Sequence, residues 1–255
     1  MPMVVALLER RPALLAVRRA FPGRPQRVLT ARSPKQLDTF LRRHLVDAVI
    51  LGPDAVRTGT LAALRDEFAS LPVACLVPLR SDDAALVRRV ARAGALLLVE
   101  GLDEPVLERE IRRRGLTARR EDALLPLADT LDLIDPLQRA AWAAIVADAP
   151  AGLATAGLAE RLGVRRETLS RRFGAGMAPS LKAAVDAVRL VAAGQLLGCR
   201  GLRVAEVAAL LGYSSTSLLQ RSCRRLVGPG VRALGALPPE AVVARALGRP
   251  TPRWP

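Results

Sequence analysis

Short apolar runs alternate with amphipathic stretches through the first part of the chain. Apolar residues at spacings of three and four, as at Leu37, Phe40 and Leu41, predict helices between these runs. The runs themselves predict five strands, at Val4–Leu8, Arg27–Ala31, Asp47–Leu51, Val73–Leu79 and Ala95–Val99. Strands that alternate with helices form a parallel sheet covered on both faces. We therefore expect residues 1–114 to be a five-stranded doubly wound α/β domain.

Two helix starts are visible in this part of the sequence. Ser33, Pro34 and Gln36 have the spacing of a capping box with proline in the first turn. A second start, at Asp103-Glu104-Pro105, is expected to open the fifth helix.

The second half of the chain has helical spacing only. Five arginines crowd around Gly115 with no apolar period beyond it, so residues 115–134 are expected to be a linker. Asp135 followed by Pro136 predicts the start of an all-helical domain over residues 135–236. Residues 237–255 form a proline-rich tail, expected to be mostly disordered, in which Glu240–Leu247 has material for two helical turns.

One pattern occurs twice in the helical half. An apolar helix leads to Gly163 in the first copy and to Gly212 in the second, and a second helix follows each glycine. The two glycines lie 49 residues apart, and each is free to take the positive φ of a tight turn. The pattern predicts two helix-turn-helix units.

The charge is concentrated in the same half. The net charge is +15, and because Lys35 and Lys182 are the only lysines, it is carried almost entirely by arginine. From Pro150 onward there are sixteen basic and five acidic residues, an excess of eleven. Solvated basic faces of an arginine-rich protein are the simpler interpretation of the charge alone, but its position on the helix pairs favours nucleic acid.

Composition excludes several other classes. With His44 as the only histidine and three cysteines without paired spacing, a zinc site and a Ser-His-Asp relay are disfavoured. No apolar stretch has the length of a membrane helix, and no secretion signal is seen, so we expect a cytoplasmic protein. Glycine-rich nucleotide loops are also missing, and no metal or cofactor is predicted.

The second helix of each pair turns a polar face outward. Leu169 and Phe173 face the core in the first copy, and Leu219 and Cys223 do so in the second. The opposite faces are expected to read base edges through Glu167, Ser170, Arg171, Thr216, Ser217, Gln220 and Arg221. Phosphate contacts are expected from Arg165, Arg166, Arg172, Ser215 and Arg224. The alternative is that these are merely the polar faces of a helical bundle.

Residues 136 to about 235 resemble the DNA-binding domain of AraC/XylS-type transcriptional regulators. The motifs that carry the resemblance are Leu158–Val164, Leu169–Phe173, Arg189-Leu190 with Leu196-Leu197, and Val204–Ala208 through Gly212-Tyr213, Ser217 and Arg221 to Gly228. The resemblance implies two helix-turn-helix units joined by a long helix, with each second helix in a successive major-groove segment.

The chain also departs from this family. The family's phenylalanines and closing residues in the second unit are replaced here, so we expect that unit to pack less tightly; the positions are Leu219, Cys223, Val231 and Leu234-Gly235. In the first unit Gly174 and Gly176 precede the usual glycine position, so a shorter helix end is expected.

Residues 1 to about 114 more faintly resemble a response-regulator receiver, a flavodoxin-like fold. Receivers use an acidic pair, an aspartate, a hydroxyl and a lysine after successive strands for Mg²⁺ and phosphoryl transfer. The corresponding positions here are Glu9 with Arg10, Gly52, a residue near Leu79 or Arg80, and Glu100 or Gly101. Phosphorylation is therefore not expected, although Asp54 is an alternative acceptor. The resemblance implies a degenerate receiver (pseudo-receiver) for dimerisation or for signal or partner binding.

These observations favour a bacterial-type, sequence-specific DNA-binding transcriptional regulator rather than an enzyme. The expected partners are double-stranded DNA, RNA polymerase and a second copy through the first domain, with no membrane. An interaction scaffold with non-specific nucleic-acid binding is the alternative. An enzyme of doubly wound fold is a third hypothesis, and it rests on fold analogy alone.

Overall fold

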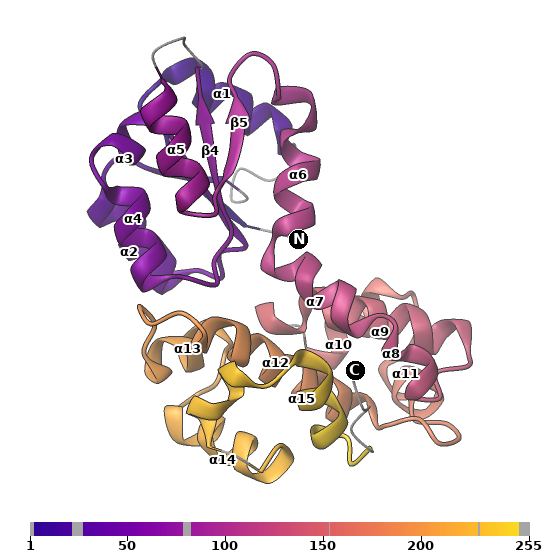
Figure 1. Cartoon of the computed structure of the whole chain (residues 1–255). Coiled ribbons are helices and arrows are strands. Elements are labelled where there is room, and N and C mark those ends of the chain that lie inside the picture. The colour runs from indigo at the N-terminus through magenta and orange to yellow at the C-terminus, as the bar shows by residue number, and fades with distance from the viewer. Residues whose placement is uncertain (1–2, 22–27, 79–82, 153, 229, 250–255) are drawn as a thin grey trace. The chain divides into compact units, whose positions relative to one another are not determined.

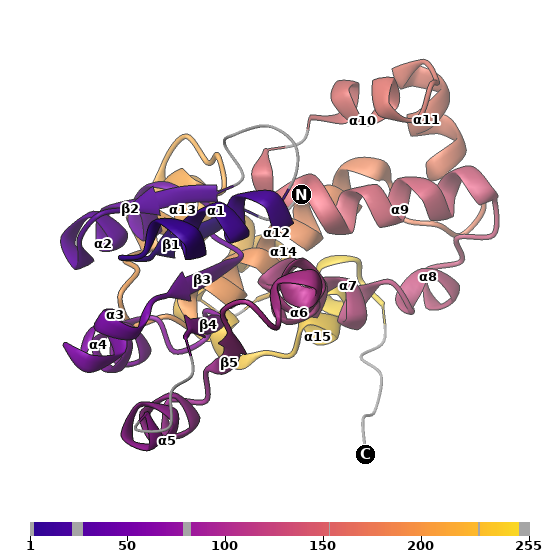
Figure 2. The ribbon, with the colours of Figure 1, turned by 90° about the horizontal axis from the view of Figure 1, so that it is seen from above.

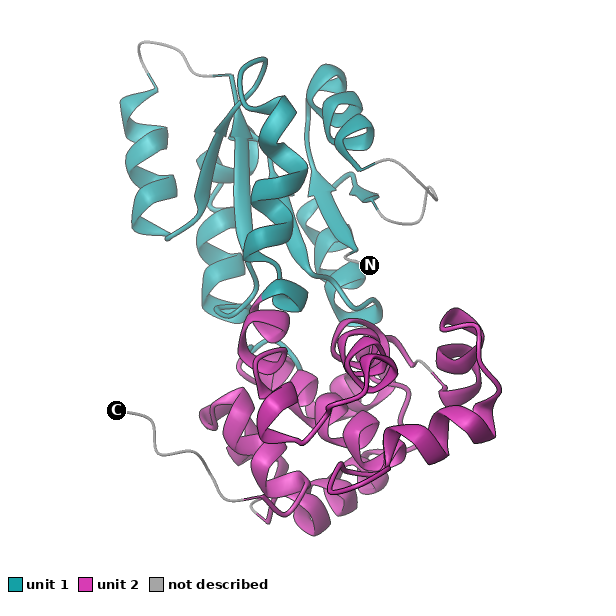
Figure 3. Ribbon diagram, turned by 90° about the vertical axis from the view of Figure 1, so that its right-hand side faces the viewer, with its two compact units in different colours: residues 1–118, 199–202 teal, residues 119–198, 203–255 magenta. Residues whose placement is uncertain are grey.

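A computed structural model describes residues 3–21, 28–78, 83–152, 154–228 and 230–249. The chain divides into two compact units (Figure 3). The first comprises residues 1–118 and 199–202, and the second comprises residues 119–198 and 203–255. Each unit is described by itself below.

The first unit contains a parallel five-stranded sheet, as predicted. Its strands are β1 (Val4–Leu7), β2 (Val28–Ala31), β3 (Ala48–Leu51), β4 (Val73–Val77) and β5 (Leu96–Val99). Their order is β2-β1-β3-β4-β5, with Val5 opposite Leu29 on one side and Val49 on the other. This is the order of a flavodoxin-like sheet. Of the expected strand ends, Arg27 and Leu79 lie outside the described residues.

Helices cover both faces of this sheet (Figure 1). They are α1 (Arg11–Ala20), α2 (Pro34–Arg43), α3 (Pro53–Arg57), α4 (Thr60–Glu67), α5 (Ala84–Arg92), the 3₁₀ turn η2 (Glu104–Val106) and α6 (Leu107–Arg114). The core on one face joins Val17 of α1 and Ile111 of α6 to Val4, Ile50 and Leu76 of the strands. Alternate strand residues are buried on the other face as well, as a doubly wound sheet requires.

The two predicted helix starts differ in detail from the structure. Ser33 Oγ accepts the Gln36 N–H at 3.2 Å, but the Gln36 side chain accepts the N–H of Arg32, one residue earlier than a capping box has it. The fifth helix does not begin regularly at Asp103. That carboxylate accepts the Val99 N–H at 2.7 Å, and the chain passes through η2 before α6 begins at Leu107.

Residues 115–134, expected to be a linker, contain two helices. These are α7 (Leu116–Leu124) and α8 (Leu127–Thr130). Arg120 of α7 is 4% exposed and donates to the carbonyls of Val146 and Ala147 and to Gln195 Oε1, at 2.7 to 3.1 Å. It thereby satisfies carbonyls that a helix end leaves without partners.

The regular elements described in the second unit from α8 onward are all helical. They are α9 (Pro136–Asp148), η3 (Ala149–Ala151), α10 (Thr155–Arg161), α11 (Arg166–Phe173), α12 (Leu181–Leu197), α13 (Val204–Leu210), α14 (Thr216–Leu226), η4 (Val231–Ala236) and α15 (Pro239–Ala246). Trp142 of α9 is buried, and its Nε1–H donates to the Leu124 carbonyl at 2.9 Å. The fold class predicted from the sequence is confirmed.

Helix α12 is the centre of this unit and contacts α9, α13, α15 and η4. Gly194 lets η4 approach closely, because a Cβ there would lie 2.9 Å from the Leu234 carbonyl oxygen. Helix α15 lies in the stretch expected to be a tail, and its buried side chains are Ala241, Val242, Val243 and Ala244. The helical alternative for this stretch is thus the one observed, while the last prolines lie outside the described residues.

None of the described helices has the length and apolar content needed to cross a membrane.

Candidate nucleic-acid interface

Two helix pairs, α10–α11 and α13–α14, have the same turn. Gly163 ends the first helix of one pair with φ +66°, and Gly212 ends that of the other with φ +69°. In each turn the residue after the glycine donates its N–H to the carbonyl five residues earlier, at 3.0 and 2.9 Å. This is the Schellman arrangement of a glycine-terminated helix, so the two helix pairs share one backbone geometry at the turn.

Both pairs are closed by fully buried side chains. In the first pair Leu158, Leu169 and Phe173 are 0% exposed, and in the second Leu219 and Cys223 are 0% exposed. The smaller Leu219 and Cys223 are therefore as fully buried as their counterparts in the first pair, and η4 packs beside α14. Looser packing of the second helix pair stays a prediction.

The predicted residues of α11 lie mainly on its exposed face. Glu167, Ser170 and Arg171 are exposed, as are Arg165 at the N-cap and Arg166 at the first helical position. The three arginines make no side-chain hydrogen bond or ion pair with any described residue. Their guanidinium groups are therefore available to an external acceptor.

Arg172 is engaged within the protein. Its Nε and Nη2 donate to Asp135 Oδ2 at 3.1 and 2.5 Å. The Leu137 N–H and then Arg172 hold the pKa of Asp135 below its ordinary value. Arg172 therefore differs from the other arginines predicted to contact phosphate.

Gln138, on the first turn of α9, holds the end of α11. Its side chain is buried, and Nε2 donates to the carbonyls of Arg172, Phe173 and Ala175 at 3.2, 3.0 and 3.4 Å. Gly174 has an ordinary negative φ, so no left-handed glycine ends the helix directly. An amide from another helix takes over that capping role. Gln138 was not among the predicted site residues, and the only local signal for it in the sequence is its position three residues after Asp135.

The predicted residues of α14 are also mostly exposed. Ser217, Gln220, Arg221 and Arg224 are exposed, while Thr216 is half-buried. Ser215 is the N-cap, and its Oγ accepts the Leu218 N–H at 3.2 Å. Accepting that bond leaves the hydroxyl hydrogen free to donate.

Arg189 of α12 supports the turn between α13 and α14. Its guanidinium lies 4.4 Å from the centre of the Tyr213 ring, and its Nη2 donates to the Leu211 carbonyl. Burial raises the pKa of Tyr213, and the charge of Arg189 opposes that rise. Arg189 belongs to the motif that resembles the AraC/XylS family, but its contact with the turn is visible only in the structure.

The carboxyl edge of the sheet in the first unit lacks the arrangement of a receiver site. Gly52 follows β3, and a Cβ there would lie 2.0 Å from Glu9 Oε2, so the Glu9 carboxyl group fills that space. Arg10 pairs with Glu100 at 2.9 Å, an ion pair with the signs opposite to those of receivers. Leu79 and Arg80 lie outside the described residues. Among the described residues no group of three or more His, Cys, Asp or Glu side chains is placed to hold a metal ion.

Residues 158–232 match the model of a helix-turn-helix domain family, over both helix pairs and α12 (Figure 2). This match supports a DNA-binding transcription regulator with an AraC-type domain. No curated protein matches the chain. Among solved structures, full-length FixJ from B. japonicum is 16% identical, with 92% of this chain and 98% of that chain covered and a TM-score of 0.36. A similarity this low indicates neither the function nor the arrangement of this chain.

Proposed function

We propose that this chain is a sequence-specific transcriptional regulator that reads two successive major-groove segments with α11 and α14. The observation that carries the proposal is the repetition of one helix-turn-helix geometry, with a polar face turned outward in both copies. A helix of this kind fits the major groove, and two such units on one chain fit two segments one helical turn apart.

The exposed side chains have the chemistry of base reading. Arg171 and Arg221 present forked donors for guanine, Gln220 suits adenine, and Glu167 accepts from cytosine. Three hydroxyl residues, Ser170, Thr216 and Ser217, complete the two faces.

Phosphate contacts would flank these faces. Arg165 and Arg166 stand at the start of α11, and Arg224 lies on α14. Ser215 adds a hydroxyl donor beside the first N–H groups of α14. For Arg172, the Nε–H and one Nη2–H lie on Asp135, which leaves the two Nη1–H groups and the second Nη2–H for a phosphate.

For the first unit we propose a role in dimerisation or in signal or partner binding without phosphorylation. The absence of phosphorylation is supported by Gly52, which stands where receivers have the aspartate, and by the Arg10–Glu100 pair, whose charges are opposite to those that phosphoryl transfer needs. Contact with RNA polymerase and a cytoplasmic location belong to the same proposal. Incubation with acetyl phosphate and Mg²⁺ is expected to leave the intact mass unchanged. A phosphoryl group that is gained by the wild type and absent from Asp54→Asn would contradict this part and assign Asp54 as the acceptor.

The deciding experiment is selection of sheared genomic DNA by the purified chain at ~0.15 M salt, followed by sequencing of the bound fragments. The proposal expects a motif of two blocks about 10 bp apart, centre to centre. A single block would restrict base reading to one of the two helices, α11 or α14. Binding without any enriched sequence would instead support an interaction scaffold with non-specific nucleic-acid binding.

A further inference from the structure

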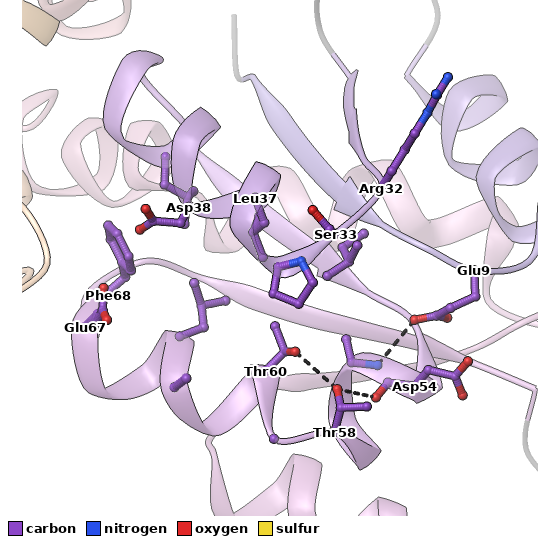
Figure 4. Close-up of a pocket in the computed structure, with 17 residues that line it drawn as sticks. Glu9, Arg32, Ser33, Leu37, Asp38, Asp54, Thr58, Thr60, Glu67 and Phe68 are labelled. Atoms are coloured by element: carbon purple, nitrogen blue, oxygen red, sulfur yellow. Dashed lines mark hydrogen bonds between the residues drawn. The ribbon is translucent and has the colours of Figure 1, made fainter.

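The first unit contains a groove of about 640 Å³ between α2 and α4 (Figure 4). Its walls are largely apolar and come from Leu37 and Leu41 on one helix and Leu64 and Phe68 at the other. This volume and lining are those of a small-molecule site, in which a few polar groups fix the orientation of an apolar ligand.

The groove opens at the place where a doubly wound sheet binds its ligands. Leu7 and Glu9 come from the end of β1, and Asp54 and Ala55 follow β3. Connections leave β1 and β3 toward opposite sides of the sheet, so the strand order places its topological switch point between them. Ligands of such folds bind outside the carboxyl ends of the strands at that point.

Charges lie at both ends of the groove. Asp38 and Glu67 at one end each pair with Arg42, at 2.9 and 3.2 Å. At the other end Asp54 pairs with Arg57 at 3.3 Å, whereas Glu9 pairs with no cation of the described residues. Carboxylates therefore outnumber their cationic partners along the groove, and Glu9 is the lining carboxylate that has no cationic partner among the described residues.

Two neighbouring residues fix the position of the Glu9 carboxylate. Its Oε1 accepts the Ala55 N–H at 3.3 Å, and its Oε2 lies against Gly52, where no side chain displaces it. Partial burial, and then the charge of Asp54, raise the pKa of Glu9. A positive charge brought beside this carboxylate would offset both costs. The lining guanidinium of Arg32 extends away from the other side chains (Figure 4).

We propose that the first unit binds a small organic cation with an apolar body in this groove, with the body between α2 and α4 and the cationic head on Glu9. Thr58 and Thr60, whose hydroxyl oxygens lie 3.2 Å apart at the same end, offer further polar contacts to the head. The inference rests on the signal-binding role proposed for the first unit, and it does not depend on DNA binding.

The test uses three probes of nearly equal shape, measured by calorimetry on the full chain without DNA. They are phenethylamine, a cation; phenethyl alcohol, which is neutral; and hydrocinnamate, an anion. We expect the amine to bind at least about tenfold more tightly than the alcohol and hydrocinnamate not to bind. Equal affinity for the amine and the alcohol, preference for the anion, or no binding by any probe up to about 5 mM would overturn the proposal.

Variants locate the site. Glu9→Gln is expected to remove the advantage of the amine and leave the alcohol unaffected. Ala63→Phe, at an exposed position of α4 that lines the groove, is expected to abolish binding of both probes by filling the space. Asp66→Asn removes one charge from the same helix outside the groove, so it is the matched control and is expected to change nothing.

An affinity for the amine that stays above that for the alcohol in Glu9→Gln, or binding of either probe that persists in Ala63→Phe, would place the site elsewhere and refute the inference. The same preparations are assayed for selection of genomic DNA. A chain that selects DNA but shows no preference for the amine refutes the ligand inference alone. A chain that binds the amine and enriches no sequence refutes the DNA-reading proposal alone.

Discussion

The guanidinium of Arg189 stacks on the Tyr213 ring at 4.4 Å while its Nη2 donates to the Leu211 carbonyl. One side chain of α12 thus contacts both neighbours of Gly212, the residue that turns the chain between α13 and α14. Arg189 is half-buried, and a cation on an aromatic face contributes about 0.5 to 2 kcal/mol, depending on how far it is removed from water. Arg189 therefore links the turn that precedes α14 to the long helix, beside the contacts made through α13 and η4.

Arg189→Ala is expected to lower the free energy of unfolding of the second unit by about 1 to 3 kcal/mol, because the Leu211 carbonyl loses its donor and Tyr213 its cation. The measurement is urea denaturation followed by circular dichroism. Arg245→Ala, at an exposed position of α15, is the control and is expected to stay within about 0.5 kcal/mol of wild type. Arg189→Lys keeps the charge but not the planar fork, so its free energy of unfolding should lie between those of Arg189→Ala and wild type. Wild-type stability of Arg189→Ala would show that the contact does not support the turn.

Gln138→Ala is expected to weaken reading of the DNA block contacted by α11 and to spare the block contacted by α14. The substitution removes the side-chain donor of the Phe173 carbonyl at the end of α11, at a cost of about 1 to 3 kcal/mol. Selected DNA motifs and denaturation curves of the variant would be compared with those of Arg139→Ala. Arg139 is the next residue on α9, and its exposed pair with Asp129 contributes little. Equal weakening of both blocks would argue against a local effect on α11.

The elements that depend on local pattern could be predicted from the sequence. Apolar runs predicted the five strands because a parallel sheet is buried on both faces. Gly163 and Gly212 predicted the two turns because a positive φ there favours glycine.

The contacts that depend on distant partners could not be predicted in this way. Arg120 lies in an arginine-rich stretch that has the composition of a linker, yet three acceptors from α9 and α12 surround it. Asp103 has the position of an N-cap, but its carboxylate accepts a bond from Val99 instead. The capping of α11 by Gln138 is of the same kind, since 34 residues or more separate donor and acceptors. In each case a polar side chain satisfies a backbone group that only the folded structure brings near.

Replacing Arg171 or Arg221 by alanine is expected to cost about 1 to 3 kcal/mol on the selected site and to relax one base position each. Both guanidinium groups are exposed on the outward faces of their helices. Affinities for the selected site and for single-base variants of it would be measured at fixed salt. An equal loss on random DNA would contradict base reading by these two residues.

The phosphate arginines should behave differently and thereby provide the contrast. Alanine at Arg165, Arg166 or Arg224 is expected to weaken binding to all sequences alike. Each substitution should also reduce the slope of log K against log salt by about 1, because one fewer counterion is released. A slope that does not change would remove that residue from the phosphate contacts.

The three cysteines, Cys75, Cys199 and Cys223, are expected to be unreactive in the folded protein. All are buried, and burial raises the pKa of each thiol, that of Cys75 to about 12. The thiolate is the reactive form, so Ellman's reagent at about pH 8 should find no fast thiol in the native chain and three after unfolding in urea. A raised pKa also means that the folded state holds a proton that the unfolded state has released. The contribution of Cys75 to stability is therefore complete below pH 9.0 and falls as the pH rises toward about 12. A rapidly reacting thiol in the native protein would contradict this expectation. It would show that one of these side chains is exposed, and a redox function of that cysteine would then have to be tested.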